Sequence, residues 1–166
     1  LTGSGVTRRG GYGINLRGWG FPQPAGVLTI EGGQVTATGG AAMETDPKGD
    51  YFEGGRAIIA DTSVTISGGT VIATGGASEA QKGGDGLFSP SLEISGSATS
   101  VTSTGGASNA ADGGVGLFVT SDIAIDAATV TATGGNGKAN EFGIYSPSGQ
   151  LTIGHDSIVQ ASGGQG

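Results

Sequence analysis

Cysteine is absent from this chain of 166 residues, and basic side chains are few. Without cysteine the chain has neither a disulfide framework nor a thiolate metal site. The seven lysines and arginines are outnumbered by 14 aspartates and glutamates, which gives a formal net charge of −7. This sign argues against nucleic acid and anionic membranes as partners. No apolar run approaches the roughly 20 residues of a membrane-spanning helix, so we expect no membrane span.

Glycine, in contrast, accounts for 37 residues and recurs in a repeat. The segment VTISGGTVIATGG, residues 64–76, is typical of two short strands joined by a Gly-Gly turn and followed by a second glycine pair. Related segments occupy residues 28–40, 92–106, 123–135 and 151–164, and their closing glycine pairs are 36, 30, 29 and 29 residues apart. A period near 30 predicts a solenoid, with many glycines in turns of positive φ.

Alternation of apolar and polar residues defines the strands. Val64, Ile66 and Val71 point to one face, whereas Thr65 and Ile72 point to the other. A third short strand follows the glycine pair of each coil, at residues 57–59, 86–88, 116–118 and 143–145. Three short strands per coil predict an all-β, right-handed parallel β-helix of about five coils, each of roughly 30 residues.

The whole chain, residues 1–166, is expected to form one β-helix domain. Residues 1–12 are predicted to be a partial coil or a cap, and the coils begin at residue 13. The repeat pattern begins and ends abruptly, and we therefore expect the domain to be a segment of a longer chain.

Variable loops follow the glycine pairs, at residues 41–56, 77–85, 107–115 and 136–142. Insertions in a solenoid collect on one edge, which is often the binding edge. Asp85 and Asp112 lie in successive loops and are expected to converge there with backbone carbonyls, a ligand set that suits calcium. The alternative is that they are solubilising loop acids. The sequence requires no cofactor, and calcium is the metal for which it offers candidate ligands.

Aromatic side chains form only 5% of the chain, and several of them lie in its first third. Tyr12, Trp19 and Tyr51 are the candidate carbohydrate-binding residues, because exposed aromatic faces suit the C–H faces of sugar rings. The alternative is that the Trp19 region caps the open N-terminal end of the solenoid. Phe88 and Phe118 occupy matched positions in adjacent coils and are predicted to stack.

Groups suited to acid–base catalysis are scarce. The one histidine, His155, stands beside Asp156 in a predicted solvated turn. Enzymes built on a parallel β-helix, such as pectate lyases and polygalacturonases, need acids or bases clustered on one flank. No acid or base recurs here at a matching place in neighbouring strands, so we expect a protein that is not an enzyme and has no catalytic residue.

Two segments resemble a known group of proteins. GGDGLFSPSLEISG (residues 83–96) and LTIEGGQVTATGG (residues 28–40) are similar to bacterial cell-surface β-helix repeats described as carbohydrate-binding domains. The resemblance implies a parallel β-helix, in a family that includes calcium-dependent binders of polygalacturonate. Only Asp85 matches the aspartate of the family's G-D-G motif, while the equivalent positions hold Arg56, Val115 and Phe142.

These features together predict an extracellular module, secreted or on the cell surface, that binds a polysaccharide or a host or cell-surface glycan at its variable-loop edge. Other domains of the same longer chain are its expected neighbours. The alternative is a structural stalk or adhesin segment of a bacterial surface protein, which has no small ligand.

Overall fold

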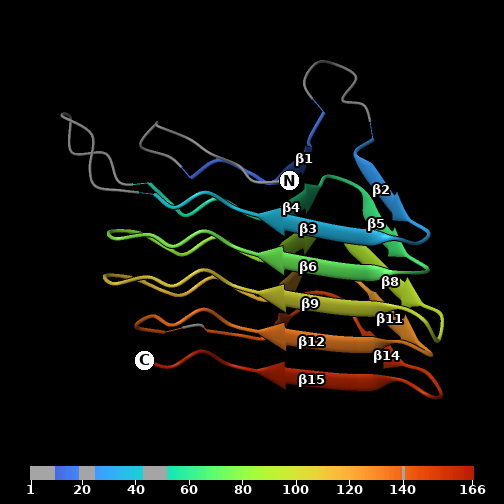
Figure 1. Cartoon of the computed structure of the whole chain (residues 1–166). Coiled ribbons are helices and arrows are strands. Elements are labelled where there is room, and N and C mark those ends of the chain that lie inside the picture. Colours follow the sequence, from blue (N-terminus) through green and yellow to red (C-terminus); the bar gives the residue numbers. More distant parts are fainter. Residues whose placement is uncertain (1–9, 19–24, 43–51, 140) are drawn as a thin grey trace.

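The computed structural model describes residues 10–18, 25–42, 52–139 and 141–166, and over these residues the chain forms strands and no helix. The strands make three sheets that run along the length of the molecule (Figure 1). In spatial order, the first sheet contains β1 (Ile14–Leu16), β4 (Ile58–Ala60), β7 (Leu87–Ser89), β10 (Leu117–Val119) and β13 (Ile144–Tyr145). The second contains β2 (Val27–Ile30), β5 (Ser63–Ile66), β8 (Ser91–Ser95), β11 (Ile123–Asp126) and β14 (Leu151–Ile153). The third contains β3 (Gln34–Thr38), β6 (Thr70–Thr74), β9 (Ser100–Thr104), β12 (Thr129–Thr133) and β15 (Ile158–Ser162).

Neighbouring strands are parallel in all three sheets. Consecutive strands enter the first, second and third sheet in turn, so one pass through the three sheets is one coil. Seen from the N-terminal end, the chain turns clockwise as it recedes, which is a right-handed winding (Figure 1). The predicted fold class, a parallel β-helix with three short strands per coil, is confirmed. The first-sheet strands begin one residue later than predicted, as in β4, which starts at Ile58 rather than at residue 57.

Aliphatic side chains at alternate positions fill the interior. In the third sheet Val71 pairs with Val101, and Val101 pairs with Val130, so that identical side chains lie above one another. In the second sheet Ile66, Ile94 and Ile125 form an equivalent column. These residues are at most 1% exposed. Burial of each such side chain stabilises the fold by about 1.5–3 kcal/mol, and the inward and outward faces agree with the alternation in the sequence.

The glycine pairs form a close-packed layer of backbone at the loop edge. After β6, β9 and β12, the segment that leaves the third sheet and the segment that returns to the first sheet run side by side (Figure 1). Gly84 N donates to Gly76 O, and Gly106 N donates to Gly84 O, each over 2.8 Å. A Cβ added at Gly84 would overlap backbone atoms of Gly55 and Gly54.

The expectation that many glycines serve turns of positive φ is wrong for most of the described residues. Among the described glycines, positive φ is confined to Gly33, Gly69 and Gly96. The other glycine pairs are required because two backbone segments approach so closely that no side chain fits between them. The pairs predicted as exits from the strands are therefore a structural layer in their own right.

The final coil presents part of its aliphatic face to solvent. Strands β13, β14 and β15 stand at one end of their sheets, and Leu151, Ile153 and Ile158 are exposed. The partners of Leu151 and Ile153 one coil earlier, Ile123 and Ile125, are buried. Within the described part of the chain, no helix is long and apolar enough to cross a membrane.

Candidate functional site

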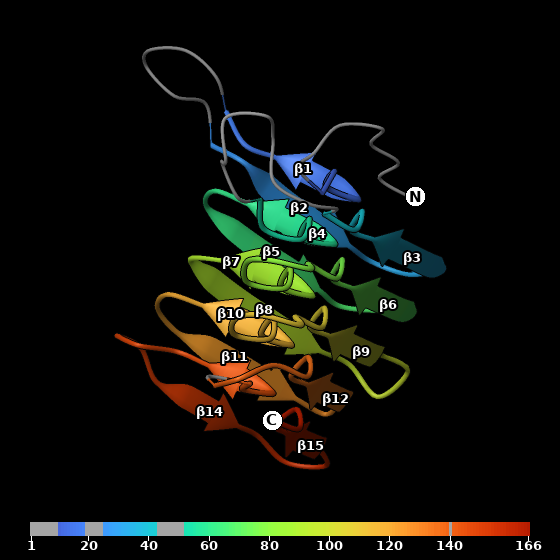
Figure 2. The ribbon, with the colours of Figure 1, turned by 90° about the vertical axis from the view of Figure 1, so that its left-hand side faces the viewer.

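Two rows of residues run along the first sheet, with one residue from each coil in each row. The strand row consists of register partners whose chain neighbours point into the core: Asn15, Ile59, Phe88, Phe118 and Tyr145. The loop row lies two residues before the start of each strand: Tyr12, Arg56, Asp85, Val115 and Phe142. The loop row stands where the chain passes from the loop edge, which faces the viewer in Figure 2, into the first sheet.

Four aromatic residues of these rows form a continuous series, which we call the aromatic ladder. The rings of Phe88 and Phe118 meet edge to face, with centroids 5.2 Å apart, and Phe118 is 5.4 Å from Tyr145. Phe142 stacks on Tyr145 at 5.0 Å, with 13° between the ring planes. The predicted contact of Phe88 with Phe118 is confirmed, and the ladder continues to Phe142 and Tyr145, which are 41% and 36% exposed.

A buried carboxylate occupies the middle of the loop row. Asp85 is 1% exposed, and its Oδ2 accepts a hydrogen bond from Arg56 Nε at 2.8 Å. Its Oδ1 accepts from Lys82 Nζ at 2.7 Å and from the backbone N–H of Val115 at 3.0 Å. Burial of a carboxylate is costly unless charged and polar partners compensate it. Here two cations and one backbone N–H do so, and we call Arg56, Lys82 and Asp85 the ionic cluster.

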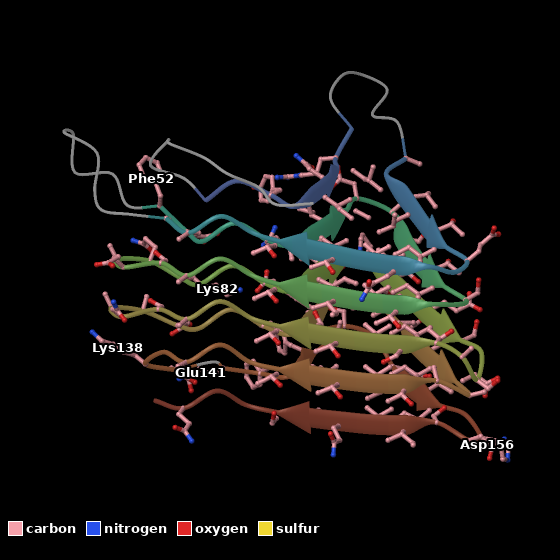
Figure 3. All side chains as sticks on the ribbon, viewed as in Figure 1. Phe52, Lys82, Lys138, Glu141 and Asp156 are labelled. Atoms are coloured by element: carbon pink, nitrogen blue, oxygen red, sulfur yellow. The ribbon has the colours of Figure 1, made fainter. Side chains whose placement is uncertain are left out.

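The ionic cluster lies against the aromatic ladder. The guanidinium carbon of Arg56 is 4.3 Å from the ring centroid of Phe88, and Lys82 Nζ is 5.4 Å from that of Phe118. Both distances fall within the range of cation–π attraction. Each cation thus contacts Asp85 on one side and a ring on the other, which fixes its position and covers part of the ring. Figure 3, in which Lys82 is labelled, places it on the loop edge, across the molecule from Asp156.

The two candidate calcium ligands are placed differently in the stack. Asp85 is level with Val115, its hydrogen-bond donor in the next coil. Asp112 is level with Lys82, since Gly83 N donates to the carbonyl of Asp112 at 3.0 Å. The described residues contain no group of three or more His, Cys, Asp or Glu side chains that could hold a metal. A calcium ion bound by Asp85 would have to displace Arg56 or Lys82, and its binding stays a prediction.

Of the three aromatic residues predicted to bind carbohydrate, Tyr12 is described and Trp19 and Tyr51 lie outside the described residues. Tyr12 is 38% exposed and begins the loop row at the N-terminal end. His155 and Asp156 lie in an exposed turn before β15, where Asp156 has a φ of 57°. The backbone carbonyl of His155 accepts a hydrogen bond from Ala127 N.

The outer face of the third sheet differs in chemistry from the aromatic ladder. Its outward positions hold threonine and serine in most coils, and one column of register partners consists of Thr38, Thr74, Thr104, Thr133 and Ser162. No aromatic or charged residue occupies an outward position of these strands. The described aromatic side chains capable of stacking on a sugar are therefore concentrated on the first sheet.

Sequence reasoning missed Arg56 and Lys82 as partners of Asp85. A signal for Arg56 was present, because alignment of the repeats places it one coil before Asp85 in the same row. Opposite charges at such positions meet across the stack. The other missed residues, Phe142 and Tyr145, were also visible as aromatics at aligned positions. Comparisons with protein-family models, with curated proteins and with solved structures find no match for this chain.

Proposed function

We propose that this chain is a non-catalytic, extracellular β-helix module that binds carbohydrate along the outer side of its first sheet. The observation that carries the proposal is the exposed stack of Phe142 and Tyr145, with ring centroids 5.0 Å apart. These two rings continue a ladder whose inner members, Phe88 and Phe118, are more buried. The inner rings support the outer ones, so the exposed rings are held in place before any ligand arrives.

The chemistry of this surface suits a sugar. The C–H face of a pyranose is apolar and packs on the face of an aromatic ring, while its hydroxyls keep contact with water or polar groups. Phe142 and Tyr145 offer such surfaces at one end of the two rows, and Tyr12 offers a third at the other end. Strands stack at about 4.8 Å per coil, so an extended chain of sugars that lies along the rows passes one coil after another.

Calcium is not a requirement of this proposal. The ionic cluster already satisfies both oxygens of Asp85 with hydrogen bonds from Arg56, Lys82 and Val115. If calcium contributes, it does so through the loop acids, and binding is then lost in a chelator. Binding through the rings is unaffected by a chelator.

A second candidate is a structural stalk or adhesin segment of a bacterial surface protein, which spaces other domains of the same longer chain. The continuous aliphatic core and the constant register of the sheets favour it, because they make a stiff rod from a short repeat. This function needs no exposed aromatic surface. The two candidates therefore differ in what happens when Phe142 and Tyr145 are changed.

The test is calorimetric binding to plant, mucin and microbial polysaccharides, with calcium and again with chelator. We expect saturable binding that Tyr145→Ala and Phe142→Ala each weaken by about tenfold, which corresponds to the roughly 1.4 kcal/mol of one stacked ring. Ile158→Ala is the matched control, because it removes an exposed apolar side chain from the third sheet. Absence of binding across the panel, or equal affinity of all variants, would contradict the proposal and favour the stalk.

A further inference from the structure

We infer that this carbohydrate surface selects uncharged sugars, and that Asp85 sets the selectivity by neutralising the cations beside the aromatic ladder. The inference rests on the proposed function, since it concerns the class of glycan bound at the same rings. A basic side chain next to an aromatic ring would ordinarily attract a uronate or a sulfated sugar. The contacts of Arg56 and Lys82 indicate the opposite.

The first step is the local balance of charge. Arg56 and Lys82 share the buried Asp85. Lys82 is also flanked by acids in the adjacent coils, because Gly54 N donates to Lys82 O and Gly83 N donates to Asp112 O, each over 3.0 Å. These bonds place Glu53 and Asp112 on either side of Lys82. By the same rule Lys138 is level with Asp112, because Lys138 N donates to Ala111 O at 2.9 Å. Three basic residues (Arg56, Lys82 and Lys138) therefore stand among three acidic ones (Glu53, Asp85 and Asp112), which leaves no net positive charge here, and the surrounding chain adds to the repulsion of anions with its net charge of −7.

The second step is the geometry of the cations. A sugar carboxylate is held best by a bidentate pair of hydrogen bonds from a guanidinium group. The Arg56 Nε–H is already donated to Asp85 Oδ2, and its guanidinium lies on the ring of Phe88. Lys82 Nζ is 2.7 Å from Asp85 Oδ1. An anionic ligand that approached these cations would compete with Asp85, which is buried and depends on them as counter-charges.

The third step is what remains exposed. Val115, and not a charged residue, lies between Asp85 and Phe142 in the loop row, and it is buried. Arg56 and Lys82 lie on Phe88 and Phe118, at the inner part of the ladder. The more exposed rings, Phe142 and Tyr145, stack on each other. The surface left for a ligand is therefore apolar and suits a neutral pyranose.

The experiment compares neutral oligosaccharides with oligogalacturonate and a sulfated glycan by calorimetry, at about 0.1 M and about 1 M sodium chloride, where the Debye length falls from about 10 Å to about 3 Å. We expect the wild-type chain to bind a neutral glycan with affinity independent of salt and to bind both anionic glycans more weakly than the neutral one. Asp85→Asn removes the neutralising charge and retains the side-chain shape. We expect it to gain about fivefold in affinity for the anionic glycans at low salt.

Circular dichroism and thermal melting will show whether Asp85→Asn folds. A second variant tests the same inference if it does not. Glu53→Gln combined with Asp112→Asn removes two acids next to Lys82 without touching the buried carboxylate. It is expected to shift selectivity toward anions in the same direction and to leave neutral binding unchanged. Salt-sensitive wild-type binding to oligogalacturonate, lost in Lys82→Gln, would overturn the inference while supporting the proposed function. Failure to bind any glycan would overturn both.

Discussion

At the scale of the residue, glycine is the residue type that this fold uses most specifically. The paired glycines at the loop edge allow one backbone segment to lie directly on another. Gly105, for example, lies against Gly114 and Gly135, and the three atoms nearest to the site of its missing Cβ are all backbone atoms. Backbone atoms cannot rotate away as a flexible side chain can. An added methyl group would therefore push the backbone segments apart and displace the sheets to which they are joined.

A substitution of Gly105 by alanine tests this role of glycine. Its Cβ would overlap the carbonyl of Gly114, and we expect a loss of at least about 1–3 kcal/mol in the free energy of unfolding, as for other overpacked interiors. Gly32→Ala is the control, because no atom lies within 4 Å of the position that its new Cβ would take and its φ is not positive. We expect Gly32→Ala to change stability by less than about 1 kcal/mol. Urea unfolding measures both; equal stabilities would refute the close-packed layer.

The sequence allows the glycine period to be detected but does not distinguish the two reasons for glycine. A turn of positive φ and a close approach of two backbone segments both require glycine, so the sequence is the same in either case. The pairs next to Thr70 and Asp85 look alike, yet Gly69 has a φ of 82° in addition to close backbone neighbours, whereas Gly84 has close backbone neighbours without a positive φ. The ionic cluster was missed for a related reason, because Asp85 was interpreted together with Asp112 in the following loop. Alignment of the rows instead of the loops pairs it with Arg56.

At the scale of the element, the strands are short and gain their stability from stacking. A strand of two to five residues buries few side chains alone, and each coil completes its interior only with neighbours above and below. The alternation in the sequence therefore predicted the core well, since every coil repeats the same inward positions. It did not predict how burial changes along the stack, because that depends on the number of coils covering a position.

A pair of identical substitutions separates the position in the stack from the residue type. Ile94 in β8 is fully buried, whereas Ile153 in β14 is 50% exposed, although both belong to the same column. We expect Ile94→Ala to lower the free energy of unfolding by about 2–5 kcal/mol, through lost burial and a cavity. Ile153→Ala should cost less than about 1 kcal/mol, because much of its side chain already contacts solvent. Chemical denaturation of both variants provides the comparison, and similar losses would argue against a graded core.

At the scale of the whole molecule, the chain is a one-dimensional stack with the candidate carbohydrate surface along one side. The sequence predicted the architecture because the period and the alternation agree with each other. It identified the candidate side less well, since the three outer faces share the same repeat and differ in which residues stand at outward positions. The third sheet presents hydroxyls and the first presents rings and an ionic cluster, so one fold separates two surface chemistries.

Such a stack should open from its ends and not all at once. Strands β7, β8 and β9 are covered by coils on both sides, whereas β13, β14 and β15 have neighbours on one side only. The side chains of β14 are exposed throughout, in contrast with the alternating burial of β8. Because stability in a repeat is the sum of local terms and neighbour contacts, we expect the last coil to unfold locally with a lower free energy than the middle coil.

Hydrogen–deuterium exchange followed by mass spectrometry measures this difference directly. We expect amide protection in β8 and β9 to exceed that in β14 and β15 by at least about tenfold, which corresponds to about 1.4 kcal/mol of opening free energy. A glycan that binds at Phe142 and Tyr145 would stabilise β13 against local opening, so its addition should slow amide exchange in β13 more than in β8. Uniform protection along the stack would instead show one cooperative unit, in which the last coil opens only with global unfolding.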